Sequence, residues 1–411
     1  MSSPVHRPTL PATPIVPVLL VTALCSLGTG VLWNGIAFVA EQGYHFSKLR
    51  NLSLALFMAV LYIAGAFASG PLVRLVERRL APRSVLLLIL VLLSSTCLGL
   101  LAASAEWMLW AVAAATSVLA AMLWPIIESY VTAGRHGRDM RTTIGWWNVT
   151  WTLAVGVGLL GMAPFMSGES ESARYAIVAL GAMYALAGFA LHWFPRRPSP
   201  HDDDLSRAHV GAEYRHLLGA ARWLLPLSYL LVGTISPLLP YLLDDLQVAD
   251  GWKTPVAATW MFARVVAISL MWRWPGWHGR WGTLLAAAIG LAVGFAAIVA
   301  APSSAAILIA LAVFGAAQGA TYYAALYYAM AVGRAEVEAG GVHEALIGAG
   351  YAAGPLAGMI GITAAEYLRD APDQFKVSEQ QSIIAVALAS ILLVSPLMLR
   401  PYVRARQERH G

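Results

Sequence analysis

The amino-acid sequence predicts an all-α membrane protein made of two six-helix halves. Three observations support this prediction. Of the 411 residues, 59% are hydrophobic and only 12% are charged, long apolar runs recur along the whole chain, and one residue pattern occurs twice, about 200 residues apart. In soluble domains about a quarter of the residues are charged, because the surface faces water. The composition therefore places the chain in a lipid bilayer.

Twelve apolar runs are long enough to cross about 30 Å of hydrocarbon at about 1.5 Å per residue. Each is expected to be a helix, because backbone groups find no other hydrogen-bond partners in lipid. The first run is longer than the apolar core of a cleaved signal peptide, so it should remain as a membrane helix. In chain order, the runs cover residues 14–40, 52–70, 84–104, 107–133, 142–166, 174–194, 222–244, 254–274, 282–301, 304–332, 342–365 and 381–399.

A long polar segment separates the sixth run from the seventh. It reads PRRPSPHDDDLSRAHVGAEYRH, and its prolines, charges and lack of apolar periodicity are typical of a linker. It predicts a first half at residues 1–197, a linker at 198–218 and a second half at 219–411. The three aspartates at 202–204 are interpreted as solvated linker and not as a metal site.

The repeated pattern supports the division into halves. Residues 124–161 and 322–358 each contain an aromatic-rich helix, a Gly-Arg pair, a polar turn and a glycine-rich helix. When the Gly-Arg pairs are aligned and the second turn is made three residues shorter, Gly158 falls over Gly354. The glycines of both helices are expected to allow close helix packing.

Basic residues predict the orientation. Of the 27 Lys and Arg residues, 20 fall in the two chain ends, the linker and the other even-numbered loops, and 6 fall in the odd-numbered loops. Because basic loops stay on the cytoplasmic side, both termini are expected in the cytoplasm of a bacterial-type cell, with the protein in its inner membrane.

These features resemble the major facilitator superfamily of transporters, which are built from two repeated six-helix halves. The loop after the second helix is similar to the family's G-x-L-x-D-x-x-G-R-[KR] motif. Arg74 and Glu77 stand where the family has Asp and Gly. The matching positions are Gly70, Leu72, Arg78 and Arg79. The resemblance implies a central site between the halves and a gating contact made by this loop.

Arg264 is a charged residue near the bilayer midplane, about ten residues into the eighth helix. A charge at that depth costs about 3 kcal/mol, so it marks a candidate functional site. Its forked donors suit a substrate carboxylate, phosphate or hydroxyl. The alternative is a structural arginine held by carbonyls or tyrosines of a neighbouring helix. The sequence places no acidic residue at the same depth.

Glu128 is an acid deep in the fourth helix, six residues before Gly134. Apolar surroundings favour its protonated form, which makes it a candidate proton carrier. The rival interpretation is a gating ion pair with Arg78, in the loop that begins at Gly70. By contrast, His343 and Glu344 open the predicted eleventh helix, where the helix dipole favours an acid, so we interpret them as structural.

Aromatic and amide side chains predict the wall of a cavity. They recur at helical spacing, and phenol or indole groups offer an apolar body with a polar tip. Packing or an interfacial aromatic belt is the alternative. The candidate substrate-binding residues beside Arg264 are Trp124, Trp260, Gln318, Tyr322, Tyr323, Tyr327, Trp33, Asn34, Asn148 and Trp151.

Several classes of protein are disfavoured. Cys25 and Cys97 lie inside apolar runs and are interpreted as small buried hydrophobes. The sequence contains no P-loop and no metal-ligand motif, so we expect no cofactor, no metal and no enzymatic activity. The basic residues are spread over short loops, which fits a membrane surface and not nucleic acid.

We therefore expect a monomeric secondary transporter that moves a small organic solute by alternating access, driven by protons or another coupling ion. The aromatic candidate cavity favours export of an amphipathic or aromatic compound over uptake of a sugar or organic acid. A transporter-like sensor or scaffold without turnover is the alternative from another class.

Overall fold

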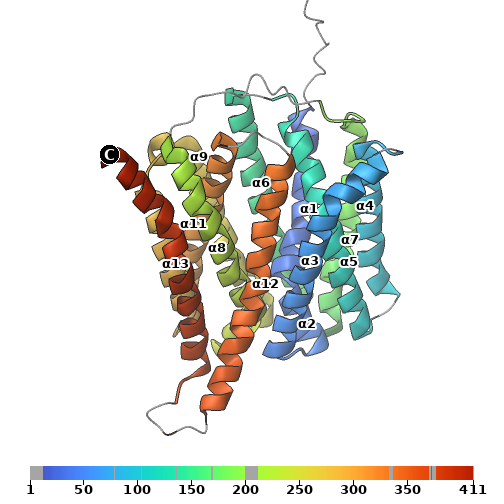
Figure 1. The fold of residues 1–411 in the computed structure, drawn as a ribbon. Helices are drawn as coiled ribbons and strands as arrows, with labels where there is room; N and C mark the ends of the chain where they lie inside the picture. Colours follow the sequence, from blue (N-terminus) through green and yellow to red (C-terminus); the bar gives the residue numbers. More distant parts are fainter. Residues whose placement is uncertain are drawn as a thin grey trace, which may run out of the picture.

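The computed structural model describes residues 13–77, 79–102, 104–135, 137–167, 170–199, 212–332, 337–369, 372 and 376–410. These residues form helices and short connections, and 12 segments are long and apolar enough to cross a membrane. Figure 1 shows the long helices side by side in one bundle. The predicted all-α class and the twelve membrane helices are confirmed.

The described residues of the first half form seven α-helices, because a π-helical turn at Thr29–Asn34 interrupts the first membrane crossing. Its helices are α1 (Ile15–Gly28), α2 (Ile36–Tyr44), α3 (Lys48–Glu77), α4 (Pro82–Leu98), α5 (Glu106–Thr132), α6 (Gly137–Met166) and α7 (Arg174–Ala190). The second half contains α8 (Ala212–Asp245), α9 (Asp250–Arg273), α10 (Trp281–Val299), α11 (Ser304–Val332), α12 (Val337–Leu368) and α13 (Glu379–His410).

Several helices extend beyond their apolar runs, because hydropathy marks the part inside the hydrocarbon and not the whole helix. The helix α8 begins at Ala212, so the end of the predicted linker is helical. The helix α12 begins at Val337, ahead of the predicted start at 342. The first membrane crossing ends with α2, which stops before His45. The backbone of His45 is left-handed, with a φ of 53°.

The repeated glycines make the same kind of contact in both halves. A Cβ atom added to Gly158 of α6 would lie 2.9 Å from the carbonyl oxygen of Leu27 in α1. A Cβ atom added to Gly354 of α12 would lie 2.4 Å from the carbonyl oxygen of Leu230 in α8. Because α1 and α8 are the first helices of their halves, the alignment found in the sequence corresponds to an equivalent packing site.

The two halves meet mainly through two helix pairs, α6 with α9 and α3 with α12. In Figure 1 the start of α1 and the end of α13 lie at one end of the bundle, called here the proximal end. The end of α2 and the start of α13 lie at the opposite, distal end. There, α2 and α3 also contact α8. No comparable packing joins α5 to α11 in the described part of the chain.

Candidate functional site

A central cavity of about 80 Å³ lies between the two halves. Eight of its 15 lining residues are Trp or Tyr, so the wall is mainly aromatic. The first half contributes Thr29, Trp33, Asn34, Tyr62, Trp124, Glu128, Trp147 and Trp151. The second half contributes Tyr229, Met261, Arg264, Tyr322, Glu344, Ile347 and Tyr351.

Arg264 is enclosed by aromatic rings and is only 1% exposed. Its guanidinium carbon lies 4.4 Å from the ring centroid of Trp151 and 4.6 Å from that of Tyr322. Its Nη2 donates a hydrogen bond of 3.4 Å to the hydroxyl of Tyr229. Ring faces attract cations, so this arrangement compensates part of the cost of the buried charge. Trp151 belongs to the first half, so the guanidinium bridges the two halves.

A glycine of α11, Gly319, allows the aromatic rings to reach Arg264. A Cβ on Gly319 of α11 would lie 2.9 Å from the carbonyl oxygen of Arg264, so only glycine lets α11 approach α9 this closely without a shift. The approach places Tyr322, one turn later, against the guanidinium. On α6, Trp151 Nε1 donates 3.0 Å to Asn148 Oδ1, and the Asn148 side chain donates 2.8 Å to the carbonyl of Ile144.

Two carboxylic acids share the cavity, Glu128 from α5 and Glu344 from α12. The hydroxyl of Tyr62, on α3, donates a hydrogen bond to Glu344 across the boundary between the halves. Tyr62 also meets Trp33 edge to face, with ring centroids 5.1 Å apart. No salt bridge joins Arg264 or either acid to another described residue.

Known proteins identify the family that has this architecture. A family model described as Major Facilitator Superfamily matches residues 18–362, which is most of the chain. The chain belongs to the major facilitator superfamily. It is therefore a secondary transporter and a membrane protein, and this family is not known to contain enzymes. No curated protein matches the chain by sequence.

Solved structures show the same fold. A bacterial homologue of the human lysosomal transporter Spinster, in an inward-facing and unoccupied conformation, is 15% identical with a TM-score of 0.67. That alignment covers 95% of this chain and 97% of the other. The nucleoside transporter NupG is 12% identical with a TM-score of 0.66, and the alignment covers 94% of this chain and 99% of the other. At these identities the likeness concerns the fold alone.

The structure of this superfamily member places about half of the predicted site residues in the cavity wall. Those in the wall are Arg264, Glu128, Trp33, Asn34, Trp124, Trp151 and Tyr322. Asn148 lies behind Trp151, and Trp260 packs against Phe314. Gln318 is fully buried, and its amide has no hydrogen-bond partner among the described residues.

Two predicted residues of α11 lie outside the wall of the central cavity. Tyr323 packs near Trp277, and Tyr327 stacks on His278 with ring centroids 4.2 Å apart. Burial lowers the pKa of His278, and nearby Arg141 lowers it further. Arg78, the surroundings of Gly70 and the side chain of His343 lie outside what the structure describes, so the predicted gating pair stays a prediction.

The interpretation of Glu344 as a residue at a helix start was wrong. Because α12 begins at Val337, Glu344 lies two turns inside the helix and faces the cavity. The sequence places no acid at the depth of Arg264, yet both carboxylic acids line the same cavity as Arg264. A signal for this face exists in the sequence: Glu344, Ile347 and Tyr351 follow the i, i+3, i+7 spacing of one helix face.

Other wall residues were missed because nothing in their own segments distinguishes them. Tyr62 is the single tyrosine of α3, Tyr229 is one of three tyrosines spread along α8, and Trp147 adjoins a second tryptophan, Trp146. Trp147 faces the cavity, whereas Trp146 meets Trp272 of α9 edge to face, at 5.1 Å between centroids. Which of two neighbouring indoles faces inward depends on helix rotation, which is set by packing against the other half.

A larger cavity, of about 290 Å³, lies at the distal end beside α3, α8 and α13. At its rim the charged groups of Lys48 and Glu379 form a 2.8 Å ion pair with each other. We take the central cavity as the candidate substrate site, because it is buried, lies between the halves and contains both acids and the arginine. The described residues contain no cluster of His, Cys, Asp or Glu that could hold a metal ion.

Proposed function

We propose that this transporter moves a small aromatic or amphipathic solute through the central cavity by alternating access, coupled to protons and in the direction of export. The aromatic wall carries the proposal. Eight ring systems offer apolar and π surface to a flat solute, whereas the wall contains a single amide side chain, that of Asn34, to bind the hydroxyls of a sugar. The ring faces around Arg264 further indicate that this site accommodates cationic groups against aromatic surfaces.

The charges of the cavity support the same substrate class. Arg264 is already surrounded by two rings and a tyrosine hydroxyl, so its charge is partly satisfied without a ligand. Glu128 and Glu344 have no cationic partner among the described residues. Two ionised carboxylates in one small cavity repel each other, and a proton or a cationic solute removes that repulsion. Competition between the two for the same pair is the basis for proton-coupled export.

The small volume supports a moving site. An apolar cavity of about 150 Å³ can bind benzene, and the central cavity has about 80 Å³. An aromatic solute therefore requires the two halves to separate around it. Packing between α5 and α11 is limited in the described chain, so these two helices oppose such a separation little.

The test is flux of defined probes into proteoliposomes under an imposed pH gradient. We use ethidium as an aromatic cation, benzoate as an organic acid and glucose as a sugar. Ethidium should accumulate against its gradient only when protons move the other way. Movement of benzoate or glucose with no movement of ethidium would instead support the uptake permease. Ethidium binding, seen as a raised unfolding temperature, without any flux would support a sensor.

A matched pair of tryptophans links transport to the cavity. Trp124 lines the cavity, whereas Trp107, on the same helix α5, is 61% exposed. Replacing Trp124 by Ala should reduce ethidium flux at least tenfold, which corresponds to about 1.4 kcal/mol of lost binding. Trp107→Ala should transport normally. Equal losses in the two variants would mean that the aromatic cavity does not bind the probe.

A further inference from the structure

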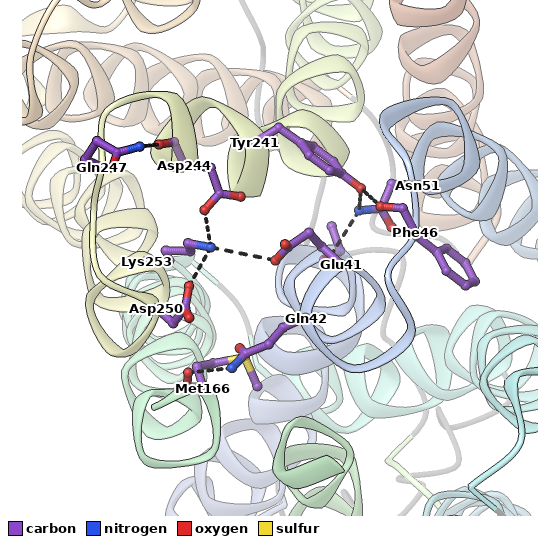
Figure 2. Close-up of polar contacts among 11 residues, drawn as sticks. Glu41, Gln42, Phe46, Asn51, Met166, Tyr241, Asp244, Gln247, Asp250 and Lys253 are labelled. Carbon is purple, nitrogen blue, oxygen red and sulfur yellow. Dashed lines mark hydrogen bonds and ion pairs between the residues drawn. The ribbon is translucent and has the colours of Figure 1, made fainter. Parts of the chain in front are cut away.

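A lysine at the distal end is surrounded by more negative charge than it neutralises. The ammonium of Lys253, a residue that is 4% exposed, lies 2.5 Å from Asp244, 2.7 Å from Asp250 and 3.7 Å from Glu41 (Figure 2). Three carboxylates around one ammonium leave a formal excess of two negative charges. Like charges at this separation repel unless one of them binds a proton.

The three acids differ in which half carries them. Asp244 ends α8 and Asp250 begins α9, so both pair with Lys253 inside the second half. Glu41 lies on α2 of the first half. Figure 2 shows that its carboxylate approaches the ammonium of Lys253 from another side than Asp244 and Asp250. Glu41 is therefore the acid of this cluster that must leave the lysine when the halves separate at the distal end.

Neighbouring polar contacts show that the two halves are closed against each other at the distal end. The amide of Asn51, on α3, donates 2.9 Å to the hydroxyl of Tyr241 on α8, and that hydroxyl donates to the carbonyl of Phe46 (Figure 2). The side chain of Gln42 donates 2.7 Å to the carbonyl of Met166. These bonds hold α2 in place, so Glu41 stays against the second half.

The surroundings of Glu41 favour its neutral form. Burial raises the pKa of Glu41 above its ordinary value, and the attraction of Lys253 only partly opposes this. Asp244 and Asp250 raise the pKa of Glu41 further, while His45 lowers it. Tyr241 is the other titratable group of α8 that interacts with Glu41 electrostatically. In contrast, the side chains of Asp244 and Asp250 are 43% and 55% exposed, so water helps to keep them charged.

We propose that Glu41 is a second proton-binding site of this transporter, at which a proton taken from the distal compartment closes the distal end. The proposal deepens the proposed proton coupling and rests on it for its role in transport. When the halves separate, Glu41 enters water and releases its proton. When they close, the neutral acid fits beside the Lys253 cluster without adding a third negative charge.

The direction of the pH effect follows from linkage. Glu41 has a raised pKa in the closed state and an ordinary value of about 4.3 in water. At a pH above both values, closing costs the energy of burying a carboxylate. As pH falls through the closed-state value, that cost disappears, and closure becomes more favourable. Each unit of pKa difference corresponds to a tenfold change in the ratio of closed to open molecules.

The test measures closure directly and needs no substrate. Ser104, which precedes α5, and Ser304, which begins α11, are exposed residues at the distal end of the two halves. Each is changed to Cys for spin labelling after Cys25 and Cys97 are replaced by Ala. Distances between the labels are measured in lipid nanodiscs at a series of pH values from 8 to 5. The population with short distances should rise as pH falls. A population that is constant over this range overturns the proposal.

Three variants test whether Glu41 causes the pH dependence of closure. Glu41→Gln should be mostly closed at every pH, because the amide has no charge to bury. Lys253→Met removes the attraction that lowers the pKa of Glu41, so its transition should move to higher pH. Glu379→Gln breaks another pair between the halves and should keep the wild-type transition. A full pH response in Glu41→Gln, or an unmoved transition in Lys253→Met, overturns the proposal. Loss of ethidium flux with an intact pH response would count against the proposed function alone.

Discussion

Replacing Gly158 by Ala tests whether close contact of α1 and α6 holds the first half together. The added Cβ would lie 2.9 Å from the carbonyl oxygen of Leu27 and 3.4 Å from the Cα of Gly30. Carbon-to-oxygen contacts of this kind normally lie at about 3.3–3.6 Å, so the two helices must move apart by roughly 0.5 Å. The neighbours are backbone atoms, which cannot rotate away as a side chain does.

The size of the effect follows from two opposing terms. Overpacking of this type costs about 1–3 kcal/mol. Alanine gains about 1 kcal/mol over glycine inside a helix. Gly161, on the same helix, gives the second term alone, because its added Cβ would meet no atom within 4 Å. The free energies of unfolding of Gly158→Ala and Gly161→Ala should therefore differ by about 1–3 kcal/mol. The helix-propensity gain in lipid does not affect this difference, because both variants share it.

The assay is the unfolding temperature of both variants in one detergent, followed by tryptophan fluorescence at one scan rate. Membrane proteins commonly unfold irreversibly, so the comparison at a fixed rate is what carries meaning. Gly158→Ala should unfold below Gly161→Ala, by about 2–4 °C for each kcal/mol in a unit of 150–250 residues. Equal unfolding temperatures would refute the reasoning that this glycine is required by the helix contact.

Three further predictions concern function and orientation. Arg264→Ala should insert and stay monodisperse but lose most ethidium flux, because the guanidinium no longer joins Trp151 of the first half to the second half, and Arg264→Lys should rescue poorly because an ammonium lacks the planar group that stacks on the rings; unchanged flux in Arg264→Ala would exclude this bridging role. Glu128→Gln should abolish proton-driven movement in liposomes while ethidium exchange stays measurable, and full coupling in this variant would exclude the proton role. A reporter active only in the cytoplasm should work after Gly411 and fail between residues 168 and 172; the reverse result would invert the proposed orientation.

The sequence predicts the helices because the cause of each lies within its own segment. A run such as 304–332 must be helical in lipid regardless of its neighbours, and α11 has those bounds. The π-helical turn at Thr29–Asn34 was not predicted, since all residues of the first run are compatible with an unbroken helix. Its wider turn sits where Trp33 and Asn34 enter the cavity wall.

The site could be predicted best where a residue is unusual for its helix. Arg264 and Glu128 stand out as charges in apolar runs, and both line the cavity. Tyr229 and Tyr351 do not stand out, yet their rings meet at 5.0 Å between centroids beside Arg264. The cluster around Lys253 was not predicted, because Glu41 and Asp244 are about 200 residues apart and only the folded halves place them together.

The contacts between the halves differ in kind, and the difference indicates how the bundle moves. The pair α6 with α9 meets through apolar atoms near the centre, where a Cβ on Gly156 would lie 3.3 Å from Met261 and Phe262. The distal contacts include polar ones such as Asn51 with Tyr241, and water replaces such bonds at a net cost of only about 0.5–1.5 kcal/mol each, whereas Leu52 of α3 meets Gly358 of α12 through apolar atoms. Opening the distal end therefore costs little per hydrogen bond, provided that α6 and α9 stay packed as a pivot. Arg264 bridges the halves at that pivot, through Trp151, so a solute that displaces the indole loosens the pivot directly.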